Sequence, residues 1–259
     1  MLQTNWHIYD HYGYAFIAVL GTLAVVVVIQ WLMCRSRWAA WVRSLHGVAP
    51  PFINIIGVLF GLTLAFLAND TWSAHDRAMT AVYKEANALH SIATLAQQLP
   101  QPLRAQLHAA LVQYAQASTS EWPQLAQRTQ SPDVVSRADA LLQLLASPEV
   151  QQAAGSNVQS LLLSKINEVC EQRDQRIALS QTHVNPLKWM GMGFLGFLTL
   201  LLVAVIHVER PRAAFVAIVL FALAAAPTAA IVLIQGNPFQ PPTAVAPTPI
   251  EAAIAGGFR

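Results

Sequence analysis

The sequence has few charged residues for its size. Of its 259 residues, 11% are charged and 55% are hydrophobic, whereas soluble proteins carry about 25% charged and about 45–50% apolar residues. Four apolar runs account for the deficit: Tyr14–Cys34, Phe52–Leu67, Leu187–His207 and Ala213–Ile234. A helix needs ~20 such residues to cross a bilayer. We therefore expect an integral membrane protein with transmembrane helices at about 14–34, 51–69, 187–208 and 212–234.

Motifs for chemistry are also scarce. The two cysteines, Cys34 and Cys170, are too far apart in the sequence to indicate a disulfide framework or a metal site. We find no Gly-rich phosphate loop, zinc motif or catalytic triad. The formal net charge of +2 comes without a basic patch interleaved with aromatics. These absences predict a protein that is not an enzyme, binds no cofactor and does not bind nucleic acid.

The first ten residues contain no lysine or arginine, so we expect the first apolar run to be a span and not a cleaved signal peptide. His7, Asp10 and His11 fall near one another on a helical turn and could hold a metal. Four aromatic side chains surround them, at Trp6, Tyr9, Tyr12 and Tyr14. This composition favours an aromatic belt at the membrane interface, so we expect no metal site.

The only large polar region, residues 70–186, carries helix signals throughout. Serine followed by proline and an acidic residue occurs at Ser131 and again at Ser147, and this order is typical of a helix start. No alternating strand pattern of useful length is present. We therefore predict an all-α protein in which a helical bundle is inserted between spans two and three, with Gly155 as the weak point of the bundle's last helix.

The expected organisation has four parts. Residues 1–69 hold the leader and the first two spans, 70–186 the polar bundle, 187–235 the last two spans and 236–259 a Pro-rich tail. No proline interrupts the chain between Pro51 and Pro100, so we expect the second span to continue as a stalk of the bundle over roughly 70 Å.

Loop charges predict the orientation. Arginines follow the first span and the third span, whereas the leader has none. The positive-inside rule then places loops 35–50 and 208–212 in the cytoplasm and the bundle outside the bacterial inner membrane.

Small and weakly polar residues follow one side of the second span. Successive residues of a helix are rotated by about 100°, which places on one side Asn54, Gly57, Gly61, Ala65, Ala68 and Trp72. Phe60 and Leu67 lie on the opposite side. The stripe could pack closely against another helix, with the glycines of span three as partner, or it could line a pore. Spacing alone favours packing, because GxxxG pairs are common in apolar helices.

Charged residues of the bundle suggest ordinary surface pairs. The run from Glu168 to Arg176 has opposite charges three and four apart, which predicts ion pairs within one helix. We expect Glu85 and His90 to lie on a solvated face of the stalk.

Short segments along the chain resemble the bacterial bestrophin-like family of four-span membrane proteins. They are "GVLFGLTLAFLANDTW" in span two, "EANALHSIATLAQQLP" after it, then "EWP", "RDQR" and "NPFQ". The matching positions outside span two are Glu85, Glu121, Trp122, Pro123, Arg173, Arg176, Asn237, Pro238 and Phe239. The family more usually has aspartate where Asn237 stands.

The resemblance implies a homo-oligomer in a lipid bilayer. Bestrophins are pentameric ligand-gated anion channels whose second span lines the pore, so the stripe would face a path for an inorganic anion. It also implies a cytosolic bundle, against the loop charges. The aromatic neck and acidic calcium site of bestrophins are not evident in this sequence.

Two functions from different classes follow. The first is an oligomeric ion channel with span two inside. The second is a non-conducting, membrane-anchored helical scaffold or sensor that binds a partner, which the lack of chemical motifs also suits.

Overall fold

The computed structural model describes residues 6–35, 44, 49–181 and 186–256. Within these ranges the chain forms α-helices and no strand. The helices are α1 (Trp6–Arg35), α3 (Ala49–Ala96), α4 (Gln101–Ser120), α5 (Trp122–Ala126), α6 (Pro132–Leu145), α7 (Pro148–Ser180), α8 (Pro186–Ile206), α9 (Pro211–Ile234) and α10 (Thr248–Gly256). The predicted all-α class is therefore confirmed.

Four helices are long and apolar enough to cross a membrane, within the described residues. They cover Gly13–Met33, Pro50–Ala96, Leu187–Ile206 and Pro211–Ile234. The first, third and fourth are close to the predicted spans, and the second begins as predicted but runs on beyond residue 69. As expected from the proline-free stretch, α3 continues without a break from the second span to Ala96. The positively charged loop residues Arg37 and Arg43 lie outside the described residues.

The chain divides into two compact units. Unit 1 comprises Met1–Trp72 and His183–Gly236, and unit 2 comprises Ser73–Thr182 and Asn237–Arg259. Unit 1 holds the spans and unit 2 the polar bundle. The segment after the fourth span, for which we predicted only a Pro-rich tail, belongs to unit 2 and contains α10.

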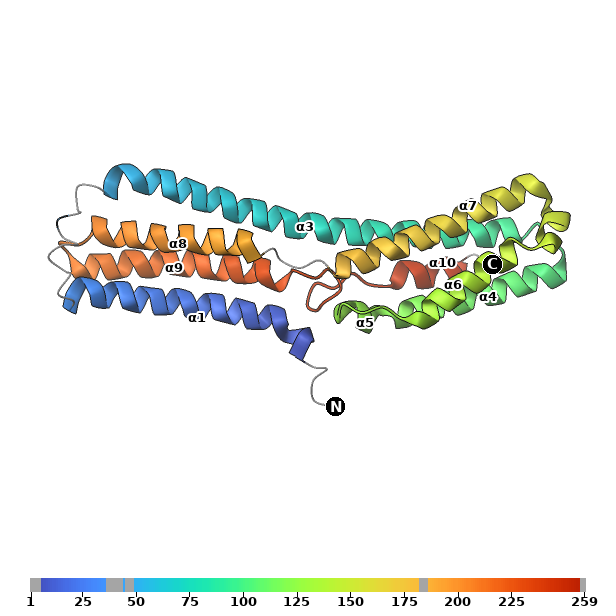
Figure 1. Cartoon of the computed structure of the whole chain (residues 1–259), viewed down its shortest axis with the longest axis horizontal. Helices are drawn as coiled ribbons and strands as arrows, with labels where there is room; N and C mark the ends of the chain where they lie inside the picture. The colour runs from blue at the N-terminus through green and yellow to red at the C-terminus, as the bar shows by residue number, and fades with distance from the viewer. Residues whose placement is uncertain (1–5, 36–43, 45–48, 182–185, 257–259) are drawn as a thin grey trace. The chain divides into compact units, whose positions relative to one another are not determined.

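In unit 1, α9 packs against both α1 and α8 (Figure 1). One apolar cluster joins these three helices through Val26, Ile29, Leu200, Ala204, Ile218 and Ala222. A second cluster joins α3 to α8 and α9 through Phe60, Leu67, Ala68, Met192, Ala229 and Val232. The side of α3 that carries Phe60 and Leu67 therefore faces the other spans.

In unit 2, α4 lies beside α6 and α6 beside α7 (Figure 1). The predicted helix starts are correct: α6 begins at Pro132 and α7 at Pro148. The Ser147 hydroxyl accepts a hydrogen bond from the Val150 amide, whereas the Ser131 side chain makes no cap. The core includes the fully buried side chains of Leu107, Leu111, Leu141, Leu145, Leu162 and Ile166.

Gly155 interrupts α7 as expected, with φ 79° and ψ 160°. This backbone region is almost closed to residues with a Cβ, and occupying it costs a non-glycine residue about 1–3 kcal/mol. We expect Gly155→Ala to lower the free energy of unfolding by about that amount, measured by thermal melting in detergent. The exposed neighbour Ser156→Ala should stay within about 0.5 kcal/mol of the parent protein. A neutral Gly155→Ala would contradict the assigned backbone conformation.

Candidate functional site

The charged residues named by the family resemblance meet in the interior of unit 2. Glu85 comes from α3, Glu121 from the junction of α4 and α5, and Arg173 and Arg176 from α7. We call these four residues the buried quartet. Each side chain is at most 6% exposed, and the four formal charges sum to zero.

Glu85 and Arg176 form a two-point ion pair across 91 residues of sequence. Arg176 Nε lies 2.6 Å from Glu85 Oε2, and Arg176 Nη2 lies 3.1 Å from Oε1. Alanines on the buried side of α3, including Ala78, Ala81 and Ala86, leave room for this close approach. Both side chains are 0% exposed, so solvent does not screen the pair.

Two hydroxyl groups of α4 complete the coordination of Glu85. Tyr114 donates to Glu85 Oε1 at 2.9 Å and Ser118 donates to the same atom at 3.1 Å. Ser118 also accepts a hydrogen bond from Arg176 Nη2 at 2.9 Å. Burial, followed by the negative charge of Glu85, raises the pKa of Tyr114 well above its usual value. The phenol therefore stays neutral and keeps donating its proton.

Glu121 and Arg173 form the second pair. Arg173 Nη2 lies 2.6 Å from Glu121 Oε1, and Arg173 Nε lies 3.2 Å from Oε2. The Ser131 amide, at the N-cap of α6, also donates to Glu121 Oε1 at 2.8 Å. Arg176 Nη2 approaches Glu121 Oε2 at 4.0 Å and links the two pairs.

Trp122 connects the quartet to the C-terminal segment. The guanidinium carbon of Arg176 lies 4.7 Å from the centre of the Trp122 ring, within cation–π range. The Trp122 indole nitrogen donates to the Val245 carbonyl at 2.6 Å, and its ring meets Phe239 edge-on. Burial has the largest single effect and lowers the pKa of Arg176, but the interactions with Glu85, Tyr114 and Glu121 together outweigh it, so the pKa is raised. Arg176 therefore remains charged.

Asn237 ties the C-terminal segment to the end of α5. Its side-chain nitrogen donates to the carbonyls of Leu125 and Ala126 at 3.2 and 3.4 Å. Its side-chain oxygen accepts from the Phe239 amide at 2.9 Å. A carboxylate could not donate to two carbonyls, so the asparagine at this position fits its neighbours. Pro238 is buried beside it, whereas Pro123 is exposed at the start of α5.

Two of our surface assignments are wrong. Arg173 and Arg176 do not pair within α7, because they pair with Glu121 and Glu85 on other helices. Glu85 is fully buried and does not lie on a solvated face. Glu168 pairs within α7 with Lys165, 2.8 Å away, a residue outside the predicted run. His90 is exposed as expected.

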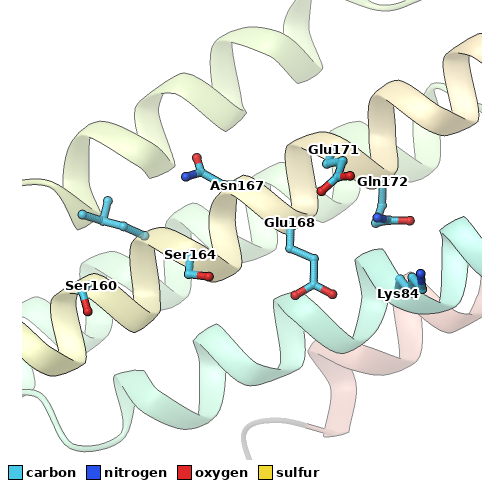
Figure 2. Close-up of a pocket in the computed structure, with 8 residues that line it drawn as sticks. Lys84, Ser160, Ser164, Asn167, Glu168, Glu171 and Gln172 are labelled. Carbon is cyan, nitrogen blue, oxygen red and sulfur yellow. The ribbon is translucent and has the colours of Figure 1, made fainter.

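A polar cavity of about 730 Å³ lies between α3 and α7 on the surface of unit 2. Figure 2 shows Lys84 on α3 opposite Glu168, Glu171 and Gln172 on α7. Among the described residues, no group of three His, Cys, Asp or Glu side chains could hold a metal ion. Residues His7, Asp10 and His11 have no described side chains.

The small-residue stripe lies on the part of α3 that belongs to unit 1, and its members differ in their surroundings, since Ala68 packs with residues of α8 and α9. Asn54, Gly61, Ala65 and Trp72 are exposed and Gly57 is half-buried, whereas Ala68 is buried. A Cβ added at Gly57 or Gly61 would meet no atom within 4 Å. Trp72 donates to Gln235 Oε1 at 3.1 Å.

The glycines of span three do not meet the stripe in the way that we expected. A Cβ at Gly196 would lie 3.1 Å from the Phe60 ring, which is on the opposite side of α3, and Cβ atoms at Gly191 and Gly193 would meet nothing within 4 Å. Within one chain, α3 therefore packs on span three through its aromatic side. Whether the stripe lines a pore or packs on another helix remains a prediction.

Comparisons with known proteins agree with the fold. The sequence model of the Bestrophin-like domain matches residues 20–250. A solved bacterial bestrophin homologue from Klebsiella pneumoniae is similar over 96% of both chains, with a TM-score of 0.60 and 14% identity. Another solved membrane protein matches 94% of this chain and 96% of its own, with a TM-score of 0.61 and 13% identity. No curated protein matches the sequence.

Proposed function

The chain belongs to the bestrophin-like family, and from that premise we propose that copies of it assemble into a ring that conducts inorganic anions, with α3 lining the pore. The chain is a multi-pass membrane protein by its four candidate spans. The observation that carries the proposal is the orientation of α3 within unit 1.

The two sides of α3 have different surroundings. Phe60 is 9% exposed and packs on Gly196 and on Phe221, whose ring centre lies 5.4 Å away. The opposite side presents Asn54, Gly61 and Ala65, which are exposed. A primary amide beside glycine and alanine gains little from contact with lipid chains, whereas it suits water or a closely packed helix. In a ring of copies, this side of α3 would face the central path.

Thiol labelling of the stripe tests the proposal. In a background with Cys34→Ser and Cys170→Ser, we expect Ala65→Cys to react with a charged, water-soluble thiol reagent. The attached group would obstruct the path, so chloride flux into proteoliposomes should fall at least several-fold.

Phe66→Cys is the matched control. Phe66 is the next residue, is 68% exposed and is rotated by about 100° from Ala65. It should label slowly and leave flux unchanged. Equal labelling of both cysteines, or labelling of Ala65→Cys without loss of flux, would show that this side of α3 does not line the pore. A parent protein that carries no flux would favour the non-conducting scaffold.

We also propose a bacterial inner-membrane location. Exposed Arg210, just before α9, and exposed Arg212, in its first turn, support a cytoplasmic placement of the connection between α8 and α9. The bestrophin resemblance implies the opposite orientation, with unit 2 in the cytosol. The side from which a reagent reaches Lys84 of unit 2 would distinguish the two.

A further inference from the structure

The exposed side of α3 that carries Asn54, Gly61 and Ala65 continues along the helix after the apolar span ends. α3 is unbroken over Ala49–Ala96, so the rotation of about 100° per residue relates side chains along its whole length. By this rotation, Asp76 lies within about 20° of the direction of Ala65. The residues that follow on the same side are all exposed: Trp72, Asp76, Thr80, Tyr83, Asn87 and His90.

Asp76 carries the only full charge on this side of α3. No other Asp, Glu, Lys or Arg between Asn69 and Thr94 falls within about 60° of the direction of Ala65. Among the described residues, Asp76 takes part in no ion pair. Its carboxylate is therefore exposed and is not neutralised by a bonded cation.

The two cations of α3 that follow Asp76 point away from its side. Arg77 is rotated by about 120° from the direction of Ala65 and Lys84 by about 100°. Arg77 Nε donates to the Ser73 carbonyl of its own helix at 3.1 Å. Lys84 lines the polar cavity between α3 and α7, opposite acidic side chains of α7 (Figure 2). The side of α3 that would face the central path is therefore negative at the level of Asp76.

In the proposed ring, each copy contributes one Asp76 carboxylate at the same level of the path. Rings of Asp or Glu side chains are typical of cation channels, because a negative ring attracts cations and repels anions. We propose that Asp76 sets the charge selectivity of the path: its carboxylate repels chloride, attracts alkali cations and so lowers the preference of the path for anions. This inference rests on the proposed function and adds the residue that discriminates between anions and cations.

Three variants of the full chain in planar bilayers test the inference. The reversal potential in a gradient of potassium chloride gives the ratio of chloride to potassium permeability. Asp76→Asn removes the charge and keeps the shape of the side chain, so it should raise this ratio at least threefold. Asp76→Glu keeps the charge and should leave the ratio close to that of the parent. Asp139→Asn removes an exposed carboxylate of α6 and should also leave it unchanged.

Salt separates an effect of charge from an effect of packing. The screening length is ~10 Å at ~0.1 M salt and ~3 Å at ~1 M. Because Asp76 is exposed, the rise caused by Asp76→Asn should become smaller in the more concentrated salt. A rise of equal size at both salt concentrations would show that the substitution changes packing, and it would overturn the role of the charge.

The possible failures of this inference and of the proposed function can be told apart. If Asp76→Asn conducts with the same permeability ratio as the parent, Asp76 does not set selectivity, and the proposed channel is unaffected. If Asp76→Asn alone loses oligomer mass, the carboxylate contacts a neighbouring copy and the inference is wrong. A parent protein that carries no flux would overturn the proposed function and this inference with it.

Discussion

Replacing Arg176 with methionine is expected to destabilise unit 2 more than any other single substitution in the buried quartet. Methionine keeps much of the side-chain volume, but it leaves the Glu85 carboxylate buried without the cation that pairs with it. Removing one partner of a buried ion pair costs about 3–5 kcal/mol. For a unit of this size, that corresponds to a fall in melting temperature of about 10–20 °C. Thermal melting of the full chain in detergent, followed by tryptophan fluorescence, measures it.

Two further variants separate the ion pair from a general loss of arginine. Arg137 pairs with Asp133 at the surface and is 42% exposed, so Arg137→Met should cost no more than about 1 kcal/mol. The double variant with Glu85→Leu and Arg176→Met should be more stable than Arg176→Met alone, because it removes the stranded carboxylate. A melting temperature of Arg176→Met equal to that of Arg137→Met would contradict the buried pair.

Replacing Glu121 with glutamine is expected to have the second-largest effect. The neutral amide would leave Arg173 buried as an unpaired cation and would weaken the bond from the Ser131 amide at the start of α6. The expected loss is about 3–5 kcal/mol, as for other broken buried pairs. The same melting experiment measures it.

Glu251 on α10 offers the matched control for this substitution. It is an exposed carboxylate of the same unit, and Glu251→Gln should change stability by less than about 0.5 kcal/mol. If Glu121→Gln and Glu251→Gln have the same melting temperature, Arg173 must have another partner and the assigned network would be wrong.

The helices of the fold could be predicted because their signals are local. The lengths of the apolar runs predicted the four spans, and the Ser-Pro-acidic order predicted the beginnings of α6 and α7. The position of Gly155 in α7 indicated an interruption for the same reason. The C-terminal segment could not be placed, since Asn237 is held by the distant carbonyls of Leu125 and Ala126.

The buried quartet was missed for two reasons. The residues of each pair are distant in sequence, and acidic residues of the same helix stand much closer in sequence to Arg173 and Arg176. Arg173 and Arg176 lie near acidic residues of α7, in the pattern of a surface helix. One signal was available. Glu85 falls on the side of α3 that carries Ala78, Val82 and Leu89, and a carboxylate in the middle of an apolar helix face needs a buried partner.

The two sides of span two illustrate a different limit. Helical geometry correctly separates the stripe of Asn54 and Gly61 from the side of Phe60. It does not say which side meets the neighbouring spans, because both close packing and aromatic packing are favourable. The structure packs Phe60 and Leu67 against α8 and α9 and leaves Asn54, Gly61 and Ala65 exposed.

The most direct test of the proposed function combines two measurements on one purified sample: the protein mass in detergent, corrected for bound detergent, and chloride flux into proteoliposomes. We predict a stable ring of several copies and a flux well above that of protein-free vesicles. A monomer or dimer with no flux would contradict the channel and leave a membrane-anchored helical scaffold as the function.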